Sequence, residues 1–317
     1  MELKMKLAPI VLFVYNRPVH TKRTVESLLN NTLSSQSILY IFSDAQKREE
    51  DKSKVEEVRK YIHSIEGFKE IHLIERKKNL GLAKSIISGV TEVIDKYDTV
   101  IVLEDDLVTS PKFLTYMNYL FNEYDNQKNI FSITGYNHPK SLMKISDNYP
   151  YDVYFNPRAC SWSWGTWKDR WDKVDWEVTD LKNFIQNKDL QKKFNYSGED
   201  KSEMLMKQMR GEIDSWAIRW DYTHFKNDSF CVYPVKSYVD NIGNDSTGVH
   251  CGKNTRFNQL NLNLLETPKV PPKIEINHEI MSDFRKVYKE NIFKKIIYGV
   301  IKDTSFYKYY RKIRYQK

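Results

Sequence analysis

The sequence predicts an α/β protein built on a mostly parallel sheet with helices on its faces. Short apolar runs rich in β-branched residues alternate with segments of helical spacing, and this order is typical of a parallel sheet. Polar and charged residues follow several of the runs, at the end of the sheet where ligands gather in such folds. The first turn lacks the glycine signature of dinucleotide-binding enzymes, and the sequence contains no P-loop signature. Both observations argue against a dehydrogenase and a P-loop NTPase.

Five strands are expected before residue 135, as short apolar runs that suit strands covered on both faces. They comprise residues 9–15, 38–42, 71–74, 100–103 and 130–134. Apolar residues at helical spacing lie between the first four strands, at residues 19–29, 55–65 and 80–94. A further helix is expected after Ser110 and Pro111, because serine is a good capping residue and proline is favoured at the first helical position.

Three consecutive carboxylates, Glu104, Asp105 and Asp106, follow the strand at residues 100–103. Adjacent acids repel one another, so they are tolerated when solvated and are favourable when a divalent cation lies among them. The alternative is a solvated turn or the cap of the next helix, but Ser110 already provides that cap. The sequence therefore favours a metal site over a plain turn.

Other charged residues follow the neighbouring strands. Arg17 comes after the first strand, Asp44 after the second, and the basic cluster from Arg76 to Lys78 after the third. Because the carboxyl ends of parallel strands meet at one edge of a sheet, we expect these side chains to lie near the three acids. This arrangement is the strongest indication of a ligand site in the sequence.

Aromatic residues dominate the next part of the chain, with five tryptophans between Trp162 and Trp176. Some of them fit the core face of a helix. Trp162 and Trp164 flank a small serine, however, and aromatic faces beside small residues are also typical of sugar-binding surfaces. Farther on, Asp214 precedes an apolar and aromatic helical run, where it is either the cap of that helix or a catalytic carboxylate.

The positive charge of the chain is concentrated at its C-terminal end. The net charge of the 317 residues is +8, and residues 291–317 contain eight basic residues and one acid. The rest is close to neutral, which argues against a nucleic-acid-binding body. Apolar and tyrosine residues accompany the basic ones, as in an amphipathic helix that lies on a membrane. The alternative is a helix docked on the domain with a solvated basic face.

Features of export or membrane insertion are not visible in the sequence. No apolar run approaches the roughly 18 residues of a membrane-spanning helix, and residues 7–15 are not followed by the small residues of a signal-peptide cleavage site. The three cysteines, Cys160, Cys231 and Cys251, have no zinc-like spacing. We therefore expect a cytoplasmic protein with reduced thiols, held by its basic tail at the inner face of the membrane.

With these residues placed, the chain resembles glycosyltransferases of the GT-A fold, in the branch of N-acetylglucosaminyltransferase I and its bacterial relatives near family 2. The resemblance covers residues 9–251. It is carried by Tyr15-Asn16-Arg17-Pro18, by Leu103-Glu104-Asp105-Asp106, and by the tryptophan-rich segment followed by Asp214-Ser215-Trp216. It implies a GT-A domain over residues 1–260, with a nucleotide-sugar-binding part (1–135), an acceptor-binding part (136–260), and a C-terminal extension (261–317).

The activity that the resemblance implies is an inverting, metal-dependent transfer of a sugar. The donor would be a nucleotide-sugar, with a UDP-sugar first, and the acceptor a saccharide or lipid-linked saccharide in surface polysaccharide assembly. Asp214 would be the catalytic base, and Asp106 would bind Mn²⁺ or Mg²⁺, with His250 as a further metal or diphosphate contact. The donor contacts would be Arg17, Asp44, Arg76, Lys78, Glu104 and Asp105. The aromatic residues expected at the acceptor are Trp162, Trp164 and Trp216.

Two other classes of protein stay open at this point. A sugar nucleotidyltransferase also binds a metal–nucleotide complex on a parallel sheet, but it usually has a glycine-rich and basic first loop, which this chain lacks. A non-catalytic membrane-binding or polyanion-binding protein would explain the basic tail. It would not explain why charged residues follow four successive strands.

Overall fold

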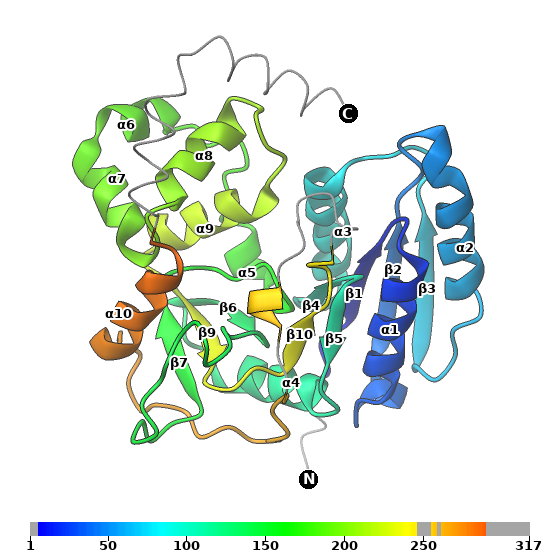
Figure 1. Cartoon of the computed structure of the whole chain (residues 1–317), viewed down its shortest axis with the longest axis horizontal. Helices are drawn as coiled ribbons and strands as arrows, with labels where there is room; N and C mark the ends of the chain where they lie inside the picture. The colour runs from blue at the N-terminus through cyan, green and yellow to red at the C-terminus, as the bar shows by residue number, and fades with distance from the viewer. Residues whose placement is uncertain (1–5, 246–254, 259–260, 290–317) are drawn as a thin grey trace.

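The computed structural model describes residues 6–245, 255–258 and 261–289. Within them, an eight-stranded sheet has the order β3-β2-β1-β4-β8-β6-β9-β7, and a two-stranded sheet joins β10 and β5 (Figure 1). The strands are β1 (Ile10–Val14), β2 (Ile38–Ser43), β3 (Glu70–Glu75), β4 (Thr99–Glu104), β5 (Leu107–Thr109), β6 (Ile130–Thr134), β7 (Val153–Asn156), β8 (Trp164–Trp167), β9 (Phe230–Pro234) and β10 (Val239–Asn241). The α/β prediction and the five strands expected before residue 135 are confirmed.

The first half of the sheet is parallel and buried on both faces. Strand β1 lies between β2 and β4, so that Ile10 is opposite both Leu39 and Ile101. Alternate residues of β1 enter two separate cores, with Leu12 in one and Val11 in the other. Apolar residues therefore occupy both faces of the strand, which explains why the sequence is continuously apolar there.

Three helices of the first half and one that follows β5 cover these two faces. Helices α1 (Pro18–Leu29), α2 (Lys52–Ile62) and α4 (Phe113–Glu123) contribute to the core that contains Leu12. Helix α3 (Leu82–Tyr97) contributes to the other core, that of Val11. The helix expected after Ser110 and Pro111 is present, but it begins at Phe113 with Lys112 at the N-cap, so Ser110 is not its cap. The Ser110 hydroxyl instead accepts a hydrogen bond from the Lys112 N–H in the turn before α4.

The second half of the sheet contains the antiparallel strands. Strand β8 lies antiparallel between β4 and β6, and β7 is antiparallel to β9 at the sheet edge. Helical spacing suggested one core helix for Trp164, Trp167 and Trp171. The structure instead places the first two in β8 and only Trp171 in the short helix α5 (Lys168–Trp171).

A group of helices lies between β8 and β9 in the sequence and away from the β1–β3 edge of the sheet in space (Figure 1). These are α6 (Leu181–Gln186), α7 (Lys188–Phe194), α8 (Lys201–Met209) and α9 (Trp216–Lys226). They share a small core of their own that includes Phe184, Phe194 and Leu205. Helix α10 (His278–Val287) packs against the outer part of the sheet through Ile280 and Phe284.

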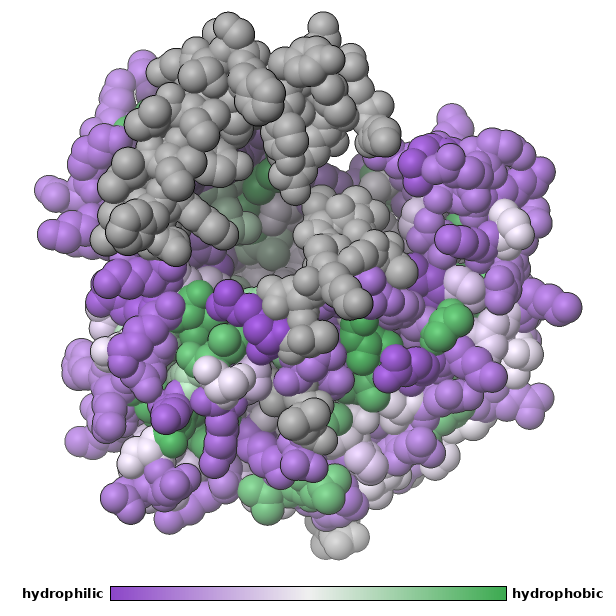
Figure 2. Space-filling view, in the orientation of Figure 1, coloured by the Kyte–Doolittle hydropathy of each residue, from purple (hydrophilic) through white to green (hydrophobic). Residues whose placement is uncertain are grey.

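Short 3₁₀ turns complete the described secondary structure: η1 (Ser34–Gln36), η2 (Glu49–Asp51), η3 (Asn195–Ser197) and η4 (Thr255–Phe257). On the face shown in Figure 2 most of the described surface is hydrophilic, and hydrophobic side chains form only small groups. Among the described residues, no helix is both long enough and apolar enough to span a membrane. The basic segment 291–317 lies outside the described residues.

Candidate functional site

The acidic turn between β4 and β5 is held by hydrogen bonds that two other segments donate to its backbone carbonyls. The Thr24 hydroxyl, on α1, donates a hydrogen bond to the Asp105 carbonyl at 2.8 Å. The backbone N–H of Ile242, just after β10, donates to the Asp106 carbonyl at 2.9 Å. These bonds hold the peptide groups of the turn, so the carboxylates project from a rigid support.

Arg17 lies against two of the three acids. Its Nη2 atom is 2.5 Å from Asp105 Oδ1 and 2.6 Å from Asp106 Oδ2. All three side chains are largely buried, which strengthens the electrostatic interactions among them. The prediction that Arg17 meets the acids at the strand ends is therefore confirmed. We call Arg17, Glu104, Asp105 and Asp106 the strand-end site.

The strand-end site holds more negative than positive charge. Burial, followed by the charges of Asp106 and Asp105, raises the pKa of Glu104 to about 8, although Arg17 opposes this rise. Burial also raises the pKa of Asp105, again against the effect of Arg17. One guanidinium is thus insufficient for three carboxyl groups, and a further cation placed among them would favour their charged forms.

Asp44 binds the backbone of the segment that precedes α3. Its carboxylate accepts hydrogen bonds from the N–H groups of Leu80 at 3.0 Å and Gly81 at 3.2 Å, and from that of Ala45 at 3.0 Å. Burial raises the pKa of Asp44, while these three donors and the charge of Arg76 favour the charged form. The structure thus places Asp44 and Arg76 near each other, and a donor contact by Asp44 stays a prediction.

Besides Arg17, two basic residues are expected at the donor, and they differ in their surroundings. The Arg76 guanidinium lies over the Phe42 ring, 5.1 Å from its centroid, and donates a hydrogen bond to Ser88 Oγ at 3.4 Å. Its Nε atom is buried and without a hydrogen-bond partner among the described residues. Lys78 is exposed. Arg76 therefore has unused hydrogen-bonding capacity, whereas Lys78 is free to reorient in solvent.

Asp214 is not the cap of the helix that follows it. Ser215 has that role, because its hydroxyl accepts the N–H of Ile218 at the start of α9. The exposed Asp214 carboxylate instead accepts a hydrogen bond from the N–H of Ala83 at 3.3 Å, in the first turn of α3. A helix N-terminus favours a negative charge at this position. Asp214 and Asp44 therefore both bind the segment from Leu80 to Ala83.

Two of the three expected acceptor contacts are corrected by the structure. The side chains of Trp164 and Trp216 are 1% and 2% exposed, and their rings stack on each other with centroids 4.9 Å apart. Trp171 and Trp220 cover Trp164 as well. No ring face of Trp164 or Trp216 is therefore available to an acceptor, and both residues belong to the core. The structure leaves only Trp162 partly exposed.

Trp162 packs edge-on against Tyr136, with ring centroids 4.6 Å apart, and against Phe257 at 5.9 Å. Its acceptor role stays a prediction. His250, the further candidate for a metal contact, lies outside the described residues.

Sequence reasoning missed Thr24 and Ile242, which hold the acidic turn, because a hydroxyl on a helix face and a backbone N–H have no distinctive local signature.

The donor set of the strand-end site suits a hard divalent cation. Carboxylate oxygens are the ligands that Mg²⁺ and Mn²⁺ prefer. In the described part of the chain, no three His, Cys, Asp or Glu residues are arranged to enclose a metal. The site therefore fits a cation held by one or two carboxylates that takes its remaining ligands from substrate phosphates and water.

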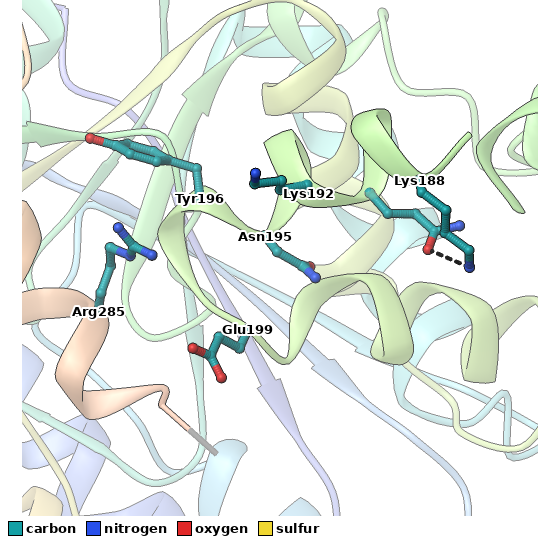
Figure 3. Close-up of a pocket in the computed structure, with 7 residues that line it drawn as sticks. Lys188, Lys192, Asn195, Tyr196, Glu199 and Arg285 are labelled. Carbon is teal, nitrogen blue, oxygen red and sulfur yellow. Dashed lines mark hydrogen bonds between the residues drawn. The ribbon is translucent and has the colours of Figure 1, made fainter. Parts of the chain in front are cut away.

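A polar pocket of about 520 Å³ lies elsewhere, between α7, η3 and α10 (Figure 3). The labelled side chains around it are Lys188, Lys192, Asn195, Tyr196, Glu199 and Arg285. Arg285 approaches from α10, opposite the side chains of η3, and its guanidinium is 5.5 Å from the Tyr196 ring centroid. The pocket shares no residue with the strand-end site.

A comparison with known protein families agrees with this fold. The family described as "Glycosyl transferase family 2" matches residues 10–197. Together with the sheet topology, this match confirms the predicted GT-A fold class. The comparison with curated proteins gave no match.

Two solved structures are similar at low sequence identity. The crystal structure of S. aureus TarS is 11% identical, with a TM-score of 0.44, over 75% of this chain and 37% of that chain. The mannosyltransferase PcManGT from Pyrobaculum calidifontis, in complex with GDP-Man and Mn²⁺, is 9% identical, with a TM-score of 0.37, over 58% of this chain and 55% of that chain. The match thus spans little more than a third of the first protein and about half of the second.

Proposed function

The chain belongs to glycosyl transferase family 2, and from this premise we propose that it is an inverting, metal-dependent glycosyltransferase. It moves a sugar from a nucleotide-sugar donor, with a UDP-sugar as the first candidate, to a saccharide or lipid-linked saccharide acceptor. The observation that carries the proposal is the excess of carboxylates over cations in the strand-end site. Such a site attracts a divalent cation, and with it the diphosphate of a donor.

The residues of the strand-end site divide the donor contacts among them. Asp106 would hold the cation, and Glu104 and Asp105 would contact the ribose and the water ligands of the cation. A bound Mn²⁺ or Mg²⁺ supplies neutralisation of the negative charge that develops on the leaving nucleoside diphosphate. Arg17 binds the diphosphate, which competes for its guanidinium with Asp105 and Asp106, the two carboxylates that Nε and Nη2 contact in the structure.

Asp214 is the base that accepts the proton of the acceptor hydroxyl as that hydroxyl attacks the anomeric carbon. Its carboxylate is exposed, and it is held at the first turn of α3 by the N–H of Ala83. General-base catalysis of this kind contributes about 10²–10⁴-fold to the rate. A single displacement with a single base inverts the configuration at the anomeric carbon, as in hydrolases that use a carboxylate to activate the attacking group.

The composition of the C-terminal segment supports a site of action at a membrane surface. The basic and aromatic residues of 291–317 suit an anionic membrane surface. We therefore place the enzyme at the inner face of the membrane, where lipid-linked saccharides of surface polysaccharides are assembled.

A transfer assay with a panel of nucleotide-sugars and Mn²⁺ tests the proposal. Asp214→Asn should lower kcat about 10²–10⁴-fold without changing donor affinity, because it removes only the proton acceptor. Asp228→Asn is the matched control, since Asp228 is exposed at the other end of α9 and should leave kcat unchanged. Near-normal transfer by Asp214→Asn would exclude Asp214 as the base. Release of pyrophosphate from a nucleoside triphosphate would favour a nucleotidyltransferase instead.

A further inference from the structure

Gly243 lies directly against the side chain of Asp106. A Cβ atom built at position 243 would be 1.9 Å from Asp106 Oδ2, 2.7 Å from its Cγ and 3.0 Å from its Cβ. Contacts below 3.0 Å are essentially absent between real Cβ atoms and their neighbours. Only glycine therefore allows the backbone at 243 to approach the carboxylate in this way.

The backbone around Gly243 is not free to move aside. Strand β10 pairs with β5, so that Asn241 is opposite Leu107 in the strand that follows the acidic turn. The next residue, Ile242, donates its N–H to the carbonyl of Asp106 itself, and Gly243 donates its N–H to Asn241 Oδ1 at 2.8 Å. The β5–β10 pairing and the Ile242 N–H thus tie the segment to the turn, and the bond from Gly243 to Asn241 holds the segment locally.

Arg17 restricts the orientation of the Asp106 carboxylate from another side. Its Nη2 atom is 2.6 Å from Asp106 Oδ2, the same oxygen that faces Gly243. A side chain at 243 would therefore push this oxygen away from both its ion pair and its present orientation. Rotation of the Asp106 side chain is less costly than disruption of the β5–β10 pairing.

We propose that Gly243 is a positioning residue for the Asp106 carboxylate, and that its lack of a side chain is required for cation binding at the strand-end site. The inference rests on the proposed function in taking Asp106 as the cation ligand. It goes beyond that function by assigning the orientation of the ligand to the end of β10, a segment more than 130 residues away in the sequence.

The first test is the affinity for Mn²⁺, measured by electron paramagnetic resonance of the free ion in the presence of a saturating nucleoside diphosphate. Gly243→Ala should weaken binding about tenfold or more, as expected when a metal ligand is held in a wrong orientation. Gly135→Ala is the matched control. Its methyl group would meet Phe113 ring carbons at 2.6 Å, so it disturbs packing without touching Asp106. Its Mn²⁺ affinity should stay within about twofold of the wild-type value.

The second test is the unfolding temperature in the absence of metal. Gly243→Ala should lower it clearly in the wild-type background but far less in the Asp106→Ala background, where the two closest atoms are missing. Equal losses in both backgrounds, or unchanged Mn²⁺ affinity in Gly243→Ala, would overturn the inference. If the wild-type chain bound no Mn²⁺ while the two substitutions remained coupled, the proposed cation site would fall, but the contact between Gly243 and Asp106 would be supported.

Discussion

Two clusters of buried charge in this molecule have opposite balances. The strand-end site sets Arg17 against three carboxyl groups. A second group, which we call the inner ion-pair cluster, consists of Arg158, Asp200, Lys201 and Asp221. In it, Arg158 makes two hydrogen bonds of 2.8 Å to Asp200, and Lys201 lies 2.9 Å from Asp221. The charges of its two cations and two anions cancel.

The difference in balance is visible in the pKa values. Burial acts to raise the pKa of Asp200, but the charge and hydrogen bonds of Arg158 outweigh it and lower that pKa below the usual range. In the strand-end site, burial and neighbouring acids instead raise the pKa of Glu104 to about 8. A buried cluster that is neutral and fully paired leaves no charge for a ligand, whereas one with excess acid has the charge that a cation ligand needs.

The inner ion-pair cluster also lies where several elements meet. Asp200 and Lys201 begin α8, and Asp221 is on α9, where it accepts the N–H of Ala159 at 2.8 Å. The Tyr288 ring, after α10, covers the Arg158 guanidinium at 3.8 Å. The cluster therefore joins the helices that follow β8 to the sheet and to α10, which is a structural role.

The largest expected effect is on stability. Arg158→Met leaves Asp200 buried without its partner and should lower the free energy of unfolding by about 3–5 kcal/mol, measured by urea denaturation. Lys22→Met is the control, because Lys22 is 60% exposed and pairs with Glu26, which is 55% exposed, at the surface. That substitution should cost less than about 1 kcal/mol. Similar losses for both variants would remove the distinction between a buried and a surface ion pair.

In the strand-end site, removal of an acidic group should raise the free energy of unfolding, which is opposite to the effect of Arg158→Met. Because the folded-state pKa of Glu104 is raised to about 8 from an ordinary value of 4.5, its contribution to stability is full below pH 4.5 and is lost as the pH rises to 8. Glu104→Gln should therefore stabilise the metal-free chain at pH 8 by about 1–3 kcal/mol. The gain should disappear toward pH 4.5. A loss of stability at pH 8 would show that the acids are already balanced.

A smaller effect is expected when Arg17 is removed. The guanidinium competes with a cation for Asp105 and Asp106, so Arg17→Ala should raise the affinity for Mn²⁺ without nucleotide by about three- to tenfold. Arg17→Lys keeps a positive charge and should change it less. The Mn²⁺ affinities of both variants are measured by calorimetric titration. Weaker Mn²⁺ binding by Arg17→Ala would mean that Arg17 orders the site instead of occupying it.

The sequence predicted the parallel half of the fold and the strand-end site for the same reason. Both depend on local patterns, namely apolar runs and the charged residues that directly follow them. The meeting of Arg17 with Asp105 and Asp106 then follows from strand order, since β1 and β4 are neighbours in the sheet.

Other features depend on contacts that leave no local pattern. The burial of Trp164 follows from the insertion of β8 between β4 and β6, and a tryptophan has the same sequence signature in a core as on a sugar-binding surface. The bond between Asp214 and Ala83 joins positions 131 residues apart. The inner ion-pair cluster was missed because Lys201 and Asp200 stand in a charged stretch, where nothing distinguishes a buried lysine from its exposed neighbours.

The excess carboxylates of the strand-end site should bind a cation together with a nucleoside diphosphate. Thermal unfolding with UDP, GDP, CDP, TDP or ADP, each with and without Mn²⁺, measures this binding directly. One nucleotide should raise the unfolding temperature only when Mn²⁺ is present, because a ligand that binds only the folded state stabilises it by mass action. Asp106→Asn should abolish the shift. No shift with any nucleotide, or an undiminished shift in Asp106→Asn, would show that the strand-end site is not the donor site.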